Sequence, residues 1–542
     1  YKVLDTYEKC CLKIHLVYGY AFKMRDVDTT STYAQTLYSK VMSADVEVSE
    51  KIAFMEPEII AVDEETMNQF YTEKPELNKY KIFITEVRRG KEHSLSPELE
   101  KLLAGANELA DLPYEGFATL GNADLKFPEI TNEKGEKIQI TNGRFVPLEE
   151  SKDRRVRKEV FEKYYETFGS FKNTWATLYA GQVKQLMFYA RARKYSSTLE
   201  AAVDGNNVSP EVYKNLVEAV NDNLDKMHRY VRLRKKLLEL DELHMYDVYV
   251  PIVKDYDVKY TIEEAKELVL KAVEPLGTNY VNLIKKAFAE RWIDVVENEG
   301  KRNGAYSSGV YGVHPFVLLN FNGTLDNVFT LAHEMGHAMH SYFSNEAQNY
   351  LDSRYKIFVA EVASTTNEVL LMEYMLKNAK DNKERAYLLN HYMDSFKGTV
   401  FRQTMFAEFE KTSNEMAESG EPLTHENLTE LYLNLNKKYY GEAMISDDLI
   451  GYEWMRIPHF YYNFYVYQYA TGFSAAVAIA NRVLKEGETA VNDYMKFLQS
   501  GCTKDPVSLL RIAGVDMAAK DPINSALQVF ERVIEEMEEL TK

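Results

Sequence analysis

Apolar and polar residues follow one another with the spacing of amphipathic helices along most of the chain. Runs of this kind fill residues 1–122, return from 153 to about 239, and occur again from 378 to about 438. A period near 3.6 residues puts one apolar stripe on each helix, and such stripes must pack against one another. The pattern therefore predicts a mainly α-helical protein.

Local signals predict where several helices and connections lie. Ser209 followed by Pro210 is typical of a helix start, with the cap before a proline in the first helical position. Thr261 and Glu264 have the spacing of a capping box. Residues 246–256 (YDVYVPIVKDY) lack helical spacing and predict an extended connector.

One stretch in the first third of the chain departs from the helical period. Residues 127–145 (FPEITNEKGEKIQITNGRF) predict a β-hairpin that turns near residues 132–135. The hairpin suggests a boundary between an N-terminal helical lobe, residues 1–122, and a second region, residues 123–542.

A second non-helical stretch, residues 315–321 (PFVLLNF), predicts a strand. Proline at the first position is typical of an edge strand, which can pair with an extended peptide. The residues predicted to offer this free edge are Phe316, Val317, Leu318, Leu319 and Asn320. The alternative is a strand that is fully paired within its own sheet.

The chain's clearest chemical motif lies in a helix-like stretch, residues 324–342 (TLDNVFTLAHEMGHAMHSY). His333 and His337 are four residues apart, so both imidazoles can face one metal ion on the same side of a helix. Glu334 lies beside the first histidine, where it can reach a water molecule without binding the metal. Imidazole ligands with a neighbouring carboxylate predict zinc and metal-assisted hydrolysis. His340 is two turns from His333, too far to share a tetrahedral ion, and is expected either to pack or to support a ligand without binding the metal itself.

A catalytic zinc ion usually needs a third protein ligand. The next strong helical run, residues 358–372, carries Glu361 and Glu368 seven residues apart on one face. Either carboxylate could serve a metal, and spacing alone leaves open whether one or both are simply solvated.

Composition narrows the classes of partner. The formal net charge of −18 argues against nucleic acid and against an anionic membrane surface. Three cysteines in 542 residues do not make a disulfide framework, which favours a reducing, cytoplasmic setting. No apolar run approaches the roughly 18 residues that a membrane-spanning helix requires.

Residues 458–472 (PHFYYNFYVYQYATG) combine a histidine with five tyrosines. A tyrosine-rich helix most often packs in a core. A hydrolase also needs hydrogen-bond donors for a developing oxyanion, and both residue types can supply them.

Several ordered motifs together resemble one family. HEMGHAMHS, with a glutamate 24 residues after His337 in FVAEVASTTNE, resembles the thimet oligopeptidase (M3) family of metallopeptidases. RNGAYSSGVYGVHPFVLLNFNGTLDNVFTLAHEMGHAMHS and IPHFYYNFYVYQYATG are most similar to its bacterial oligoendopeptidase F branch. The resemblance runs from about residue 115 to the C-terminus.

The resemblance implies a role for each residue of the motif. His333, His337 and Glu361 would bind one zinc ion per chain. Glu334 would act as the general base, and Glu368 would orient a ligand imidazole.

The same resemblance extends to the tyrosine-rich segment. His459 matches the family's histidine, and Tyr467 falls at the oxyanion-stabilising tyrosine, with Tyr462 as a candidate for a second. The loop between His459 and these tyrosines is shorter and less glycine-rich than in the mammalian branch, so tyrosines a few positions away stay open as alternatives.

The resemblance also implies helical lobes that enclose a deep substrate channel, with a small β-sheet next to the zinc helix. The expected function is an endopeptidase that cleaves internal bonds of short peptides. The alternatives are a dipeptidyl carboxypeptidase of the same fold, which needs a cation for the free C-terminus, and a non-catalytic peptide-binding relative.

Overall fold

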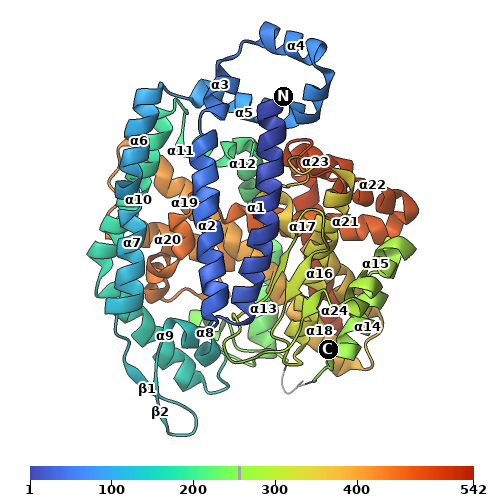
Figure 1. Ribbon diagram of the computed structural model, residues 1–542. Helices are drawn as coiled ribbons and strands as arrows, with labels where there is room; N and C mark the ends of the chain where they lie inside the picture. The colour runs from blue at the N-terminus through green and yellow to red at the C-terminus, as the bar shows by residue number, and fades with distance from the viewer. Residues whose placement is uncertain (254–257) are drawn as a thin grey trace. The chain divides into compact units, whose positions relative to one another are not determined.

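The computed structural model describes residues 1–253 and 258–542, and it is mainly α-helical, as predicted (Figure 1). The chain divides into two compact units, which we describe separately. Unit 1 consists of residues 1–93, 257–378 and 475–517, and unit 2 of residues 94–256, 379–474 and 518–542. The boundary expected near residue 122 falls inside unit 2. The channel expected between lobes concerns both units together and stays a prediction.

Unit 1 contains the HExxH motif and three groups of helices. The first group comes from the N-terminal piece: α1 (Lys2–Val27), α2 (Thr32–Ile52), α3 (Met55–Ala61), α4 (Glu64–Glu73) and α5 (Lys81–Arg89). The second comes from the middle piece: α14 (Ile262–Ala272), α15 (Thr278–Ala289), α16 (Leu325–Ala347) and α17 (Ile357–Lys377). The third comprises most of α21 (Tyr467–Glu486), then α22 (Glu488–Leu498) and α23 (Pro506–Ile512). Helices α1 and α2 lie side by side (Figure 1).

Unit 2 is a second helical body with two short two-stranded sheets. Its first helices are α6 (Pro97–Ala110), α7 (Leu112–Thr119), α8 (Asn142–Glu149), α9 (Arg154–Gly169) and α10 (Lys172–Ala192). They are followed by α11 (Thr198–Asp204), α12 (Pro210–Asn221), α13 (Leu224–Leu237), α18 (Asn382–Phe396), α19 (Arg402–Ser419), α20 (His425–Tyr440) and α24 (Asp521–Leu540). Strands β3 (Leu243–His244) and β7 (Met444–Ile445) pair in parallel.

The predicted hairpin and helix starts are confirmed. Strands β1 (Glu129–Thr131) and β2 (Lys137–Gln139) pair antiparallel around a turn in which Gly135 has a φ of 81°. The side chain of Ser209 caps α12, and Thr261 forms the expected capping box on α14. The prediction of an extended connector over residues 246–256 is only partly correct, since Met245–Asp247 is a 3-10 turn. Residues 254–256 of that prediction lie outside the described residues.

The edge-strand prediction is wrong. Strand β6 (Phe316–Leu318) is the central strand of a three-stranded sheet in unit 1, where it pairs in parallel with β4 (Ile293–Asp294) and antiparallel with β5 (Tyr306–Ser308). Val317 and Leu318 are buried, and Leu319 continues the pairing by donating its N–H to Asp294. Asn320 donates to the carbonyls of Arg302 and Gly304 rather than to a free edge. Pro315 precedes the strand, so its missing N–H removes no ladder bond.

The small sheet lies next to the helix that carries the HExxH motif, as expected, because both β5 and β6 contact α16. Helix α16 begins where the side chain of Thr324 caps the Asn327 N–H. Its apolar face, which includes Val328 and Met335, is fully buried. The sheet and this face hold the helix in a fixed position.

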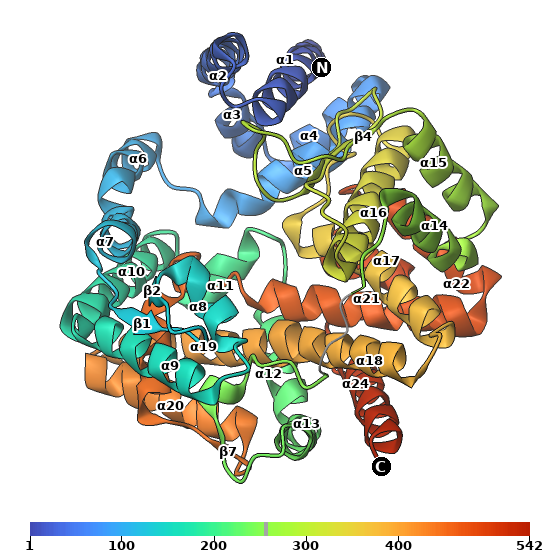
Figure 2. The ribbon, with the colours of Figure 1, turned by 90° about the horizontal axis from the view of Figure 1, so that it is seen from below.

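Helices α16 and α17 lie side by side and cross very closely (Figure 2). A Cβ atom on Gly336 would lie 2.5 Å from both the Ala363 carbonyl oxygen and the Ser364 Cα. Asn367 of α17 donates to the Ala332 carbonyl of α16 at 3.1 Å. The glycine of the motif therefore permits backbone contact between the two helices.

Within the described residues, no helix has both the length and the apolar character needed to cross a membrane.

Gly336→Ala is expected to destabilise the protein by about 1–3 kcal/mol, because the added methyl group must push α17 away from α16. Thermal unfolding should show a lower Tm together with reduced metal binding. The control is Gly105→Ala, at an exposed position of α6 where an added Cβ meets nothing within 4 Å. Equal Tm values for the two variants would contradict the close crossing.

Candidate metal centre

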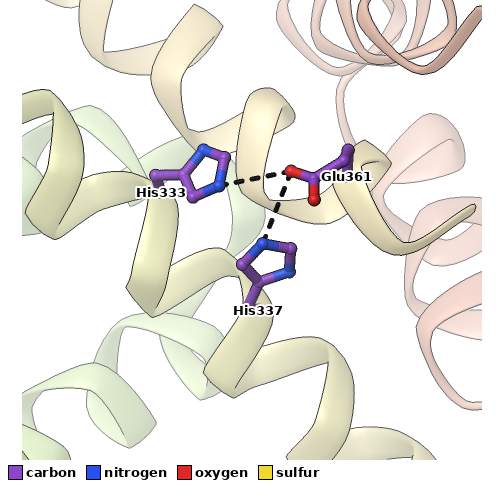
Figure 3. Close-up of side chains that lie close together, drawn as sticks. All are labelled: His333, His337 and Glu361. Carbon is purple, nitrogen blue, oxygen red and sulfur yellow. Dashed lines mark ion pairs between the residues drawn. The ribbon is translucent and has the colours of Figure 1, made fainter. Parts of the chain in front are cut away.

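Three side chains from α16 and α17 meet in unit 1 (Figure 3). His333 and His337 each direct one nitrogen, and Glu361 one oxygen, to a place where the three atoms lie within 4.8 Å of one another. The Glu361 Oε2 atom is 3.3 Å from Nε2 of His333 and 3.5 Å from Nε2 of His337. Across residues 1–253 and 258–542, this is the one cluster of three or more possible metal ligands.

The helices explain why these side chains converge. His333 and His337 are one turn apart on α16, and their rings are nearly perpendicular, with centroids 4.8 Å apart. Glu361 lies in the first turns of α17, close to the crossing at Gly336. The hydroxyl of Ser364 lies 3.2 Å from Glu361 Oε2 and restrains that carboxylate.

Glu368 approaches His333 from the opposite side of the ring. Its Oε1 is 3.0 Å from Nδ1 of His333, while Nε2 of the same ring faces Glu361. A carboxylate on Nδ1 fixes the tautomer that leaves Nε2 free to bind a metal. Sequence spacing left open which of the two glutamates could bind a metal. In the structure, Glu361 faces Nε2 of His333 and Glu368 faces Nδ1.

The cluster attracts positive charge. Burial opposes protonation of His333, but hydrogen bonds to Glu361 and Glu368 raise its pKa to about 10. Burial opposes ionisation of Glu361, yet the hydrogen bonds from both imidazoles lower the pKa of this carboxyl. A carboxylate shared by two imidazoles forms a place where a divalent cation is favoured.

Glu334 lies beside this cluster but is not part of it. Its side chain is only 6% exposed, and burial raises its pKa. Within the described part of the chain, its Oε2 is buried without a hydrogen-bond partner. A buried carboxylate with a free acceptor atom is well suited to take a proton from a water molecule.

His340 packs, which is one of the two roles expected for it. Its ring stacks on Tyr355 with centroids 3.8 Å apart, and burial lowers its pKa to about 3. It is not among the three clustered side chains.

The tyrosine-rich segment belongs to unit 2, where His459 is surrounded by three aromatic rings. The centroids of Tyr462, Tyr465 and Tyr469 lie 5.5, 6.2 and 5.8 Å from the His459 ring. Nε2 of His459 is 3.2 Å from the Tyr469 hydroxyl. None of these four side chains is buried, and Tyr462 is 44% exposed.

Tyr467, in contrast, is only 1% exposed and packs on the ring of Tyr213. It is the first residue of α21, and residues two apart on a helix point about 200° apart, so Tyr467 and Tyr469 face opposite sides. A buried tyrosine does not fit a role that requires contact with substrate. Sequence alignment alone could not separate these alternating tyrosines.

Residues that the sequence did not single out hold this segment in place. Asn463 and Phe464 have φ angles of 52° and 58°, a left-handed conformation that costs roughly 1–2 kcal/mol per residue. The Phe464 N–H donates to Glu410 Oε1 at 2.5 Å, and Gln182 Nε2 donates to the Tyr461 carbonyl. Burial raises the pKa of Glu410 to about 8. The sequence signal that could have identified Glu410 is a glutamate on the apolar face of a helix.

The donor set fits zinc. Two imidazoles and one carboxylate are ligands typical of catalytic zinc, and they leave a fourth position open. The cluster is reachable, since the side chains of His333, His337 and Glu361 are 25%, 17% and 41% exposed. The buried, unpartnered oxygen of Glu334 adds the acceptor that such a site needs.

Comparison with known proteins finds a family of peptidases. Residues 147–529 match Peptidase family M3, and residues 58–127 match the family described as Oligopeptidase F. Oligopeptidase PepF of Bacillus subtilis is 49% identical over 540 residues, covering 100% of this chain and 81% of that protein. Group B oligopeptidase PepB of Streptococcus agalactiae is 44% identical, over 97% of this chain and 88% of that protein.

Solved structures show the same fold. Oligoendopeptidase-F from Enterococcus faecium aligns with a TM-score of 0.77 and 41% identity, covering 98% of this chain and 91% of that chain. A crystal structure from Chlamydophila abortus aligns with a TM-score of 0.95 and 36% identity, over 99% and 90% of the two chains. The chain therefore belongs to peptidase family M3, and it is a metallopeptidase of the oligoendopeptidase F type.

Proposed function

We propose that the protein is a zinc-dependent endopeptidase that hydrolyses internal bonds of short oligopeptides. The observation that carries the proposal is the convergence of His333, His337 and Glu361 beside a buried carboxylate that is not a ligand, Glu334. A ligand set alone would also suit a structural metal. The added base, with a free acceptor oxygen, is what a hydrolase requires.

The residues at and around the metal cluster of unit 1 have separate tasks in this proposal. Zinc bound there would make a water molecule acidic enough to attack at neutral pH and would polarise the scissile carbonyl. Glu334 takes the proton from the attacking water and passes it to the leaving amine. Glu368 keeps Nδ1 of His333 protonated, and Ser364 holds the carboxylate of Glu361 in position.

For the oxyanion we propose His459 with Tyr469, on the resemblance to the family and on their mutual contact in unit 2. Tyr462 and Tyr465 lie against the same imidazole and are the next candidates. The burial of Tyr467 argues against the oxyanion role that the resemblance implies for it. Donors placed where negative charge develops lower the barrier because they need no reorganisation.

We also propose a reducing compartment, the cytoplasm, as the site of action. Cys10, Cys11 and Cys502 are all free thiols. Adjacent unpaired cysteines oxidise readily outside such a compartment.

Glu361→Gln should lose zinc, since two imidazoles with a neutral amide make a poor site. Glu368→Gln should keep all three ligands but weaken zinc binding by about 10–100-fold, because the ring orientation is lost. Zinc content by mass spectrometry and competition with a chelator of known affinity measure both effects. Glu346→Gln, an exposed position at the end of α16, is the control. Wild-type zinc affinity in Glu361→Gln would place the third ligand elsewhere.

Glu334→Gln should keep zinc and lose nearly all turnover, because the base is removed while the ligands stay. The assay is cleavage of an internally quenched peptide blocked at both ends, with and without chelator. Cleavage of this doubly blocked peptide by the wild type, abolished by chelator, distinguishes an endopeptidase from a dipeptidyl carboxypeptidase. Zinc loss from the variant would instead make Glu334 a ligand and refute its proposed role.

Tyr469→Phe should lower kcat by about 10²–10³-fold with little change in KM, if its hydroxyl meets the oxyanion only in the transition state. Tyr467→Phe is the matched control, two residues away and buried, and its kcat should stay near the wild-type value. The opposite result, with only Tyr467→Phe impaired, would return the role to Tyr467.

A further inference from the structure

A pocket of about 410 Å³ lies in unit 1, one helical turn beyond the metal cluster. Ser341 and Asn345 of α16 line it, so it begins four residues after His337, a rise of about 6 Å along the helix. Its other walls come from α1, from the loop after β5, and from the segment between α16 and α17. A ligand in this pocket would lie against the same helix that carries the two histidines.

Side-chain contacts tie the pocket to the metal-binding helix. The hydroxyls of Tyr355 and Ser341 are 3.0 Å apart, and the Tyr355 ring stacks on His340. A Cβ atom on Gly309 would lie 2.6 Å from Ser341 Cβ, so the loop after β5 packs directly on α16. The position of the pocket relative to the cluster is therefore fixed within unit 1.

Arg354 supplies the positive charge of the pocket. Its Nη2 donates to Nδ1 of His15 at 2.6 Å and to the hydroxyl of Tyr350 at 2.8 Å. The Tyr350 hydroxyl also bonds to His15 Nδ1. Two groups from two chain segments, His15 and Tyr350, thus fix one end of the guanidinium and leave Nε and Nη1 without a protein acceptor among the described residues.

These partners orient Arg354 without cancelling its charge. Burial, and then the positive charge of Arg354, lower the pKa of His15, so the imidazole is a neutral acceptor. Asp45 of α2 is the carboxylate that acts on His15 from nearby. Within the described chain Arg354 forms no ion pair, whereas Arg25 and Arg302 of the same unit both pair with Asp26.

We propose that this pocket binds a carboxylate of the substrate peptide, with Arg354 as the group that recognises it. Guanidinium groups match carboxylates in a two-point geometry, and an arginine held by neutral acceptors keeps its full attraction for an anion. Ser341 and Ser353 add hydroxyls to the lining. The inference rests on the proposed peptidase function and adds a substrate preference to it.

The carboxylate can come from the free C-terminus of the peptide or from an aspartate or glutamate side chain. A set of peptides with one common cleavable sequence separates these sources. The parent has an amidated C-terminus and only neutral side chains. One relative has a free C-terminal carboxylate, and others have glutamate in place of glutamine at successive positions.

Arg354 should favour at least one carboxylate peptide over the parent by about tenfold or more in kcat/KM, the size expected of a charge-assisted hydrogen bond. The same ratio should appear as a Kd ratio when binding is measured in the Glu334→Gln background by fluorescence anisotropy. Arg354→Met should reduce both ratios to about one, and Arg354→Lys should keep part of them. Arg354→Gln, which retains a donor for His15, is the second neutral variant if Arg354→Met does not fold.

Arg511→Met is the control, because it removes the same charge from an exposed site of unit 1 where Arg511 pairs with Asp516. It should leave the ratios unchanged. A wild-type ratio near one for every peptide, or a ratio that survives Arg354→Met and Arg354→Gln, would overturn the proposal. Failure to cleave any peptide, the parent included, would instead overturn the proposed function.

Discussion

The close crossing of α16 and α17 is the constraint on which the metal cluster depends. Gly336 lies between the two histidines of the motif, and its missing side chain lets the backbone of α17 come within van der Waals distance. At a normal helix separation of 8–10 Å, a glutamate on α17 would reach the imidazoles less directly. The hydrogen bond from Asn367 to the Ala332 carbonyl holds the crossing in register, and Tyr280 in turn donates to Asn367. The ligands are thus positioned by backbone packing rather than by flexible side chains.

The two carboxylates of α17 divide the work around a single imidazole. Glu361 faces Nε2 of His333 and Glu368 faces Nδ1, so the ring is held from both sides. Of the two carboxylates, Glu368 on Nδ1 is the one that fixes the tautomer and leaves Nε2 directed at the metal position. Glu334 lies outside it and is buried, which keeps its oxygen available for a proton. Neighbouring acids therefore serve different functions because their environments differ.

Strain and charge are both concentrated near groups suited to contact a substrate. In unit 2, two consecutive left-handed residues, Asn463 and Phe464, follow the exposed ring of Tyr462, and a buried glutamate stabilises that turn. In unit 1, Arg25 and Arg302 pair with Asp26, whereas within the described residues Arg354 is bonded only to neutral groups. The net charge of −18 makes most of the protein surface repel anions. Arg354, which has no acidic partner among the described residues, creates a local attraction for them.

The sequence by itself determined the helical class, the hairpin at residues 127–145, several helix caps and the two histidines of the metal cluster, while Glu361 was implied only by the family resemblance. These follow from local signals, because periodicity and capping depend on neighbours within one or two turns. The i, i+4 spacing of His333 and His337 fixes their common face before any tertiary contact forms. Only the tertiary structure decided that Glu361 and Glu368 take different sides of His333, that β6 is a central strand, and that Tyr467 is buried. Strands β4 and β5 are two and three residues long, too short to give a pattern, so the partners of β6 could not be inferred. Which tyrosine faces outward depends on where α21 begins, and the neutral partners of Arg354 come in part from a segment more than three hundred residues away. Such contacts are set by packing, and no local pattern encodes them.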